Sequence, residues 1–275
     1  MAKKQPFKYG RRTCIFCGRQ PPVVKITNEH VFSDWLRDIF PRDASSTHTH
    51  GVIRWPAEMT MEEKPSVTVN PQLQGHSGSK KVGVVCRDCN AGWLSKQVEI
   101  PAKPILVPLI AGRSGTLNVI MQRIIATWAV KTIMTAEHVN KGKSVVRQIE
   151  RDWLRDNLSP PAGWFVSAMP YNGTEWRDLG IFQHTGTLDI PPVNHDAPTE
   201  YNLGLTFMGL GRLFFLVRHS TWPRLWDVLG IDVPHVCRIW PSTHEDIQWP
   251  PPLVFSDIEA KYFTTYLARV LNEPV

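Results

Sequence analysis

Two short cysteine motifs far apart in the sequence constrain the fold of this chain more than any other feature. The first is Cys14-Ile-Phe-Cys17-Gly and the second is Cys86-Arg-Asp-Cys89-Asn. Each CxxC loop can direct both of its sulfurs at one metal ion, and two such loops supply the four thiolates of a tetrahedral Zn²⁺ site. The sequence therefore predicts a structural zinc site that joins the two ends of the segment 14–89.

Other uses of these cysteines are weaker explanations. Disulfides are rare in reducing compartments, a redox CxxC would be single and placed at a helix start, and iron–sulfur ligation usually has different spacing. The fifth cysteine, Cys237, lies alone between His235 and Arg238. We predict that it is an ordinary buried thiol.

Composition indicates a globular chain with no membrane partner. The chain has 275 residues, 42% of them hydrophobic, which is enough to bury a substantial core. No stretch approaches the roughly 18 uninterrupted apolar residues that a membrane span requires. The first twelve residues are basic but are not followed by the apolar segment of a secretory signal. We therefore expect the protein in the cytoplasm.

The positive charge is concentrated at one end of the chain. The formal net charge is +6, with 15 Lys and Arg against 9 Asp and Glu in residues 1–100 and a balance in the remainder. A basic module suits the phosphate backbone of nucleic acid, because neutralising phosphates releases counterions. An ordinary margin of charge for solubility is the alternative reading.

Periodicity predicts an α+β chain. The expected strands cover 23–26, 67–69, 82–85, 164–168, 179–183, 201–208 and 213–217. The expected helices cover 31–40, a segment starting near Ala91, 117–139, 144–158 with Ser144 as N-cap, and 257–271. A polar, glycine-containing joint near Arg113 divides the chain into 1–113 and 114–275. We expect the second part to contain helices and an antiparallel sheet.

The residues between the two CxxC loops, called the first and second knuckle below, indicate the function. Thr27-Asn28-Glu29-His30 ends the first predicted strand, and Asn90 follows the last knuckle cysteine and opens a helix that carries Glu99. This order of motifs resembles the HNH endonuclease superfamily in its zinc-stapled form, over residues 14–99. The resemblance implies a ββα-metal module in the first part of the chain. The segment from Pro101 to Lys131 also resembles the continuation in some bacterial and phage HNH proteins. The biological settings left open are phage packaging, homing, restriction, antiphage defence and toxin action.

The resemblance assigns roles residue by residue. His30 matches the general base that activates water, and Glu29 matches the acidic ligand of the catalytic divalent ion. Asn90 matches the central Asn, which fixes the loop and orients the base. Glu99 stands where the family usually has His or Asn, nine residues after that Asn. A carboxylate there favours Mg²⁺ or Mn²⁺ over softer metals.

The same chemistry follows from phosphodiester hydrolysis itself, which needs a base aimed at water and a cation beside the phosphate. Simpler explanations exist for each residue. His30 could be a capping or core histidine, Glu29 a charge at a helix start, Glu99 a surface acid and Asn90 an N-cap.

Further residues complete the set of candidates. The basic residues around the second knuckle are predicted to contact backbone phosphates: Lys80, Lys81, Arg87 and Lys96. His48, His50 and His76 are interpreted as loop histidines without a role. The tryptophans of the second part are interpreted mainly as core residues, although stacking on bases or an interface is an alternative.

Two hypotheses of different class follow. The first is a metal-dependent endonuclease that hydrolyses DNA, with RNA as an alternative substrate, and that contains structural Zn²⁺ and catalytic Mg²⁺ or Mn²⁺. The second is a non-catalytic zinc-containing module that binds nucleic acid or protein. In both, the second part of the chain serves specificity, homo-oligomerisation or partner binding.

Overall fold

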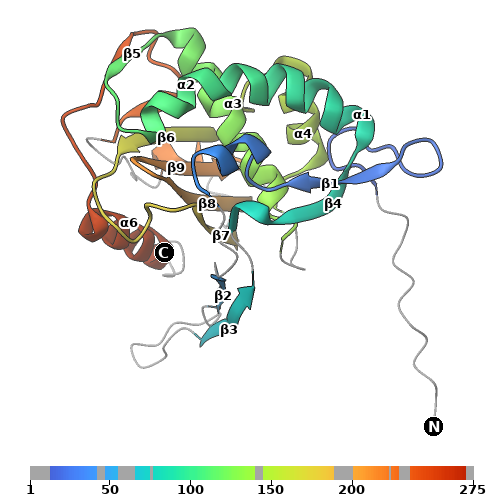
Figure 1. The fold of residues 1–275 in the computed structure, drawn as a ribbon, viewed down its shortest axis with the longest axis horizontal. Helices are drawn as coiled ribbons and strands as arrows, with labels where there is room; N and C mark the ends of the chain where they lie inside the picture. The colour runs from blue at the N-terminus through green and yellow to red at the C-terminus, as the bar shows by residue number, and fades with distance from the viewer. Residues whose placement is uncertain are drawn as a thin grey trace.

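The computed structural model describes residues 13–41, 47–54, 66–74, 77–139, 145–188, 201–222, 224–228 and 236–270. Within these residues the chain has the predicted α+β class, with antiparallel sheets and helices packed around them (Figure 1). In this part of the chain, none of the helices combines the length and apolar character that crossing a bilayer requires.

The two cysteine motifs are joined by a two-stranded antiparallel sheet. Strand β1 (Ile26–His30) pairs with β4 (Lys81–Cys86), with Ile26 opposite Cys86 and His30 opposite Lys81. The prediction for β4 is confirmed, but the first strand begins later than predicted. Val23 is 75% exposed and lies at the end of a turn. Pairing with β4 outweighs local apolar content, so the polar Thr-Asn-Glu-His segment lies inside the strand.

A helical run follows β4 directly. It consists of α1 (Arg87–Cys89), the wider π-type turns of η3 (Asn90–Glu99) and α2 (Ile100–Ile110). The run begins earlier than the predicted start near Ala91, because the Cys86 sulfur accepts the backbone N–H of Cys89 as an N-cap. Strand β1, its partner β4 and the helical run therefore form a ββα succession in space, although about fifty residues separate the two strands in sequence.

The segment between β1 and β4 differs from its prediction. In place of a helix over 31–40 the chain forms the short 3₁₀ helix η1 (Asp34–Asp38). The stretch interpreted as mostly irregular contains two paired strands, β2 (Thr47–Arg54) and β3 (Ser66–Gln74). Strand β3 includes the predicted 67–69. A short 3₁₀ turn, η2 (Ser77–Ser79), leads into β4.

The second part of the chain forms a five-stranded antiparallel sheet. Its order is β10 (Arg238–Trp240), β6 (Trp164–Pro170), β9 (Leu213–Ser220), β8 (Tyr201–Leu210) and β7 (Gly180–Leu188). All four strands predicted here are confirmed. A separate pair joins β5 (Gly115–Leu117) to β11 (Ile247–Trp249), and α5 (Leu225–Val228) follows β9.

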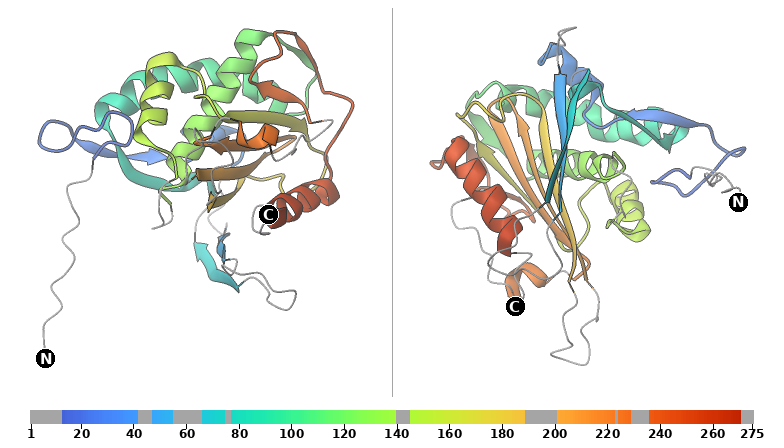
Figure 2. Two further views of the ribbon diagram at one scale, coloured as in Figure 1. Left: turned by 180° about the vertical axis from the view of Figure 1, so that it is seen from behind. Right: turned by 90° about the horizontal axis from the view of Figure 1, so that it is seen from below.

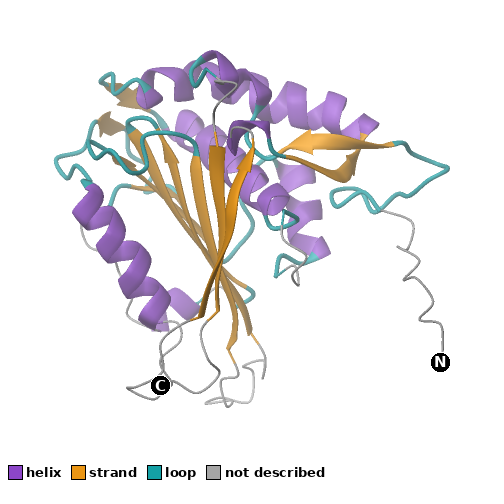
Figure 3. Ribbon diagram, turned by 60° about the horizontal axis from the view of Figure 1, so that its bottom comes forward, coloured by secondary structure: helices purple, strands orange, loops and turns teal. Residues whose placement is uncertain are grey.

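Both faces of the five-stranded sheet are covered by helices. Helices α3 (Val119–Ala136) and α4 (Gln148–Asn157) lie on one side and α6 (Asp257–Val270) on the other, as Figures 2 and 3 show. Alternate strand residues serve the two sides: Phe215 belongs to the core cluster with α3, and Phe214 to the cluster with α6. This period of two explains why β9 is apolar along most of its length.

Helices α3, α4 and α6 lie within their predicted ranges, but α3 and α4 begin later than predicted, and Leu117 belongs to strand β5 instead of α3. Helix α4 begins at Gln148, and the Glu150 carboxylate accepts the backbone N–H of Arg147 at 2.9 Å. Arg147 is therefore the N-cap, which corrects the prediction of Ser144; that residue lies outside the described part of the chain. The Asn118 side chain caps α3 by accepting the N–H of Met121.

One cluster of buried side chains runs through both predicted parts of the chain. It contains Cys14 and Leu94 from the first part, and Trp128 and Phe215 from the second. The division near Arg113 stays a prediction, and the shared cluster means that each part borders the other through apolar contact.

Candidate zinc centre and catalytic site

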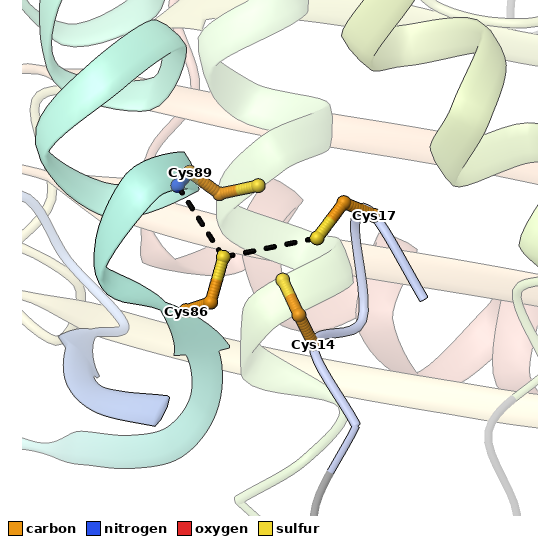
Figure 4. Close-up of side chains that lie close together, drawn as sticks. All are labelled: Cys14, Cys17, Cys86 and Cys89. Atoms are coloured by element: carbon orange, nitrogen blue, oxygen red, sulfur yellow. Dashed lines mark hydrogen bonds between the residues drawn. The ribbon is translucent and has the colours of Figure 1, made fainter. Parts of the chain in front are cut away.

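The four predicted cysteines meet at one point. Their sulfurs come from the first knuckle, from the end of β4 (Cys86) and from the end of α1 (Cys89), and they face one another (Figure 4). All four lie within 4.8 Å of one another, with Cys17 Sγ and Cys86 Sγ at 3.7 Å. Sulfurs that surround Zn²⁺ tetrahedrally at about 2.3 Å are about 3.8 Å apart. The cluster therefore fits a zinc ion with little adjustment.

Local backbone contacts hold the first knuckle beside β4. The N–H of Ile15 donates to the carbonyl of Val84 at 2.9 Å, and Gly18 closes the loop on the Cys14 carbonyl with a positive φ of 67°. Glycine adopts that conformation without strain. Cys14, Cys86 and Cys89 are buried, which protects a bound ion from solvent.

Electrostatics within the cluster favour a thiolate at Cys14, whereas burial raises the pKa of the Cys86 thiol and the hydrogen bond to Cys14 raises the pKa of the Cys89 thiol. Hydrogen bonding from the Cys89 thiol lowers the pKa of the Cys14 thiol to about 4, although burial opposes this shift. Arg19 donates to Cys17 Sγ at 3.4 Å and forms a 3.1 Å ion pair with Asp88, so it links the two knuckles at the surface. A thiolate is the form that binds a metal.

Asn90 connects the second knuckle to the first strand. Its side-chain amide donates to the Thr27 hydroxyl at 3.3 Å, and that hydroxyl donates to the carbonyl of Val85 at 3.1 Å. The predicted role of Asn90, to fix the loop and orient the base, stays a prediction; the contact itself ties the end of α1 to β1. The N-cap role of Asn90 does not apply, because the helical run has already begun at Arg87.

Glu29 and Glu99 converge, and Lys131 of α3 lies between them. Lys131 Nζ is 2.9 Å from Glu29 Oε1 and 2.6 Å from Glu99 Oε1. The lysine side chain is fully buried, the Glu29 side chain is 5% exposed and that of Glu99 is 19% exposed. Burial raises the pKa of Glu29, whereas the neighbouring ammonium opposes that shift.

Two more side chains complete the surroundings of Glu99. The Ser33 hydroxyl donates to Glu99 Oε1 at 2.8 Å, and the indole N–H of Trp128 donates to Ser33 Oγ at 2.9 Å. Glu99 is thus part of an internal hydrogen-bond chain and not the plain surface acid that its sequence context also allowed.

His30 is next to Glu29 in the chain but has different neighbours. Its Nε2 lies 3.2 Å from Asp34 Oδ1, at the start of η1, and its side chain is 19% exposed. Asp34 is itself 3.2 Å from the guanidinium of Arg37. His30 is also cross-strand partner to Lys81, and the backbone N–H of Val31 donates to the carbonyl of Lys80. Lys80 and Lys81, two of the residues predicted to contact phosphate, are therefore at the same end of the β1–β4 pair as His30.

The remaining candidates have different positions. Arg87 and Lys96 are exposed. Arg87 is at the opposite end of the β1–β4 strand pair, where its backbone N–H donates to the carbonyl of Lys25. His48 and His50 lie in β2, where the side chains are outside the description, and His76 lies outside the described residues. Cys237 is partly buried and packs against the main core; burial raises its pKa to about 11, as expected of an inert thiol.

Lys131, Ser33 and Asp34 are the residues that sequence reasoning missed. A signal for Lys131 was present, because it is a lone charge in an otherwise apolar stretch of α3 (Trp128–Met134 are buried). A lysine inside a core must be paired with acids. Its partners come from segments far away in the sequence, so the pairing was not predictable from spacing.

Comparison with known proteins found no relative of this chain: no protein-family profile, no curated protein and no solved structure matches it.

Proposed function

We propose that the chain is a nucleic-acid endonuclease of the HNH kind that hydrolyses DNA phosphodiester bonds with His30 as the general base. The observation that carries the proposal is the imidazole of His30, partly exposed and 3.2 Å from the Asp34 carboxylate, at the end of a strand pair that leads into a helix. The resemblance in motif order and the ββα succession of elements in space are two further supports. Together they support this function better than either does alone.

The histidine–carboxylate contact suits a base. An aspartate beside Nε2 favours the neutral tautomer that carries its proton on Nε2 and its lone pair on Nδ1. Nδ1 would then take the proton from an attacking water, and Asp34 would stabilise the imidazolium that forms. A base of this kind contributes roughly 10²–10⁴-fold to the rate.

The neighbouring lysines suit the substrate. Lys81 is exposed and lies opposite His30 across the strand pair, and Lys80 is partly exposed beside it. Ammonium groups at that position would hold phosphates close to the base. The excess positive charge of residues 1–100 would add a longer-range attraction.

Dependence on Mg²⁺ or Mn²⁺ is part of the proposal, but the expected pair of ligands does not fit a divalent ion well. The ammonium of Lys131 lies within hydrogen-bond distance of both Glu29 and Glu99. We therefore assign no catalytic step to an ion held by these two carboxylates. The zinc cluster, by contrast, would have a structural role, since its four sulfur ligands leave no position for substrate.

Lys131 also supports a second candidate function. An ammonium that neutralises the carboxylates favours a non-catalytic zinc-containing module that binds nucleic acid or protein. Such a module would keep the zinc cluster and the basic surface but would not cut.

A cleavage assay separates the two functions. Zinc-loaded protein is incubated with plasmid and oligonucleotide DNA and RNA, with Mg²⁺, with Mn²⁺ and without either ion. We expect cleavage by the wild type and a loss of 10²-fold or more in His30→Ala, with DNA binding retained. His244→Asn, at an exposed histidine, is the matched control and should cut normally. Cleavage by no protein under any condition would favour the binding module.

A further inference from the structure

The buried lysine of α3 occupies the position at which two acidic side chains converge. We infer that Lys131 is the resident cation of the Glu29–Glu99 pair, and that this pair takes up no divalent ion while the ammonium is in place. Lys131 is then a positioning residue of the site. Its importance for cleavage rests on the proposed nuclease function, whereas its effect on metal binding does not.

Geometry excludes both cations from the same space. The ammonium is 2.9 Å from Glu29 Oε1 and 2.6 Å from Glu99 Oε1. A Mg²⁺ ion would lie about 2.1 Å from each oxygen that it binds. An ion bound to both of these oxygens would therefore lie no more than about 4.7 Å from the ammonium nitrogen, and the two positive charges would repel each other.

The surrounding core keeps the ammonium where it is. The Lys131 side chain has no exposed surface, and its neighbours Val130 and Thr132 are also fully buried. A lysine that left the two carboxylates would remain inside the core as a charge without acidic partners, which is strongly unfavourable. Despite the opposing effect of burial, Glu29 and Glu99 raise the pKa of Lys131 above its usual value.

The hydrogen bonds around the pair join three segments of the chain. Lys131 of α3 reaches Glu29 on β1 and Glu99 at the end of η3. Ser33, held by Trp128 of α3, donates to the same Glu99 oxygen. The strand that carries His30 is therefore attached to α3 through charge as well as through apolar packing, and a positional role follows for Lys131.

The inference is tested by Mn²⁺ titration of zinc-loaded protein, with the free ion followed by electron paramagnetic resonance. We expect Lys131→Met to gain one Mn²⁺ per chain, because it leaves two adjacent carboxylates without a cation. The double variant with Glu99→Gln should lose that ion again. Lys131→Arg, which keeps the charge, is the matched control and should show no gain. The thiolate cluster prefers zinc to manganese and should not interfere.

The wild type supplies a second arm that does not depend on the folding of Lys131→Met. Mn²⁺ binding that Glu99→Gln leaves unchanged supports the inference, and so does an absence of binding. Binding by the wild type that Glu99→Gln abolishes overturns it, as does a folded Lys131→Met protein that gains no ion. Asp34→Asn identifies any ion held at the His30–Asp34 contact. Absence of cleavage in the separate assay would remove the nuclease proposal and leave these results standing.

Discussion

The side-chain amide of Asn90 lies 3.3 Å from the hydroxyl of Thr27 and donates a hydrogen bond to it. The same Thr27 hydroxyl donates a hydrogen bond to the carbonyl of Val85 on β4. The residue after the second zinc knuckle thus holds both strands of the β1–β4 pair. His30 lies three residues beyond Thr27 on the same strand, so the end of the strand pair that carries the cysteine cluster and the proposed base belong to one local framework.

Removing the amide should weaken this framework. We expect Asn90→Ala to lower the free energy of unfolding by about 1 kcal/mol, the usual net worth of a hydrogen bond. Thr27→Val removes the partner, and the double variant should cost less than the sum of the single ones. Urea unfolding of the four proteins measures this, and additive effects would mean that the two side chains do not interact.

The cysteine cluster predicts the metal content. Elemental analysis should find one zinc per chain, and Cys86→Ser should lose the zinc and melt at a clearly lower temperature, because binding energy of the metal is also folding energy. Cys237→Ser, which changes the cysteine outside the cluster, is the control and should keep one zinc. A Cys86→Ser protein with full zinc content and unchanged melting would contradict this assignment.

Lys80 and Lys81, at the His30 end of the β1–β4 strand pair, predict the salt dependence of DNA binding. Affinity should fall steeply as salt rises, and Lys81→Ala should reduce the slope of log K against log salt by about 0.9, the value for one phosphate contact. Lys261→Ala, exposed on α6, serves as the control. If the two variants have equal slopes, Lys81 does not contact phosphate.

The buried His219 predicts how stability depends on pH. The ring stacks on Trp164 at 4.1 Å between centroids, and burial, with a further effect of Arg151, lowers its pKa from 6.5 to about 3. The folded state therefore keeps it neutral while the unfolded state takes up a proton below about pH 6.5. Its contribution to stability is complete above that pH and is lost as pH falls toward 3, by about 1.4 kcal/mol per pH unit.

Urea unfolding between pH 7.5 and 4.5 measures this contribution. His219→Leu should flatten the acid side of the profile relative to the wild type, while the zinc cluster contributes equally to both proteins. His244→Asn should leave the profile unchanged. Parallel profiles for His219→Leu and the wild type would show that the ring is not held neutral in the folded protein.

The sequence by itself determined the features that arise from local pattern. The CxxC loops predicted four sulfurs at one point, since each loop is short enough to orient both thiols. Alternation and apolar content predicted β6 to β9, and helical spacing predicted α3 and α6. These elements satisfy most of their own hydrogen bonds with near neighbours or with a partner strand, so their type is visible in a short window of residues.

Only the tertiary structure decided where β1 begins and what Glu29 and Glu99 contact. The strand is set by pairing with β4, and that pairing moved the Glu29–His30 motif from the end of a predicted strand into the strand itself. The partner of both acids is Lys131, which reaches them from a helix beyond the predicted module. The partner of a buried charge is the opposite charge that the packing of distant elements places beside it. The spacing of residues along the chain does not reveal which residue that is.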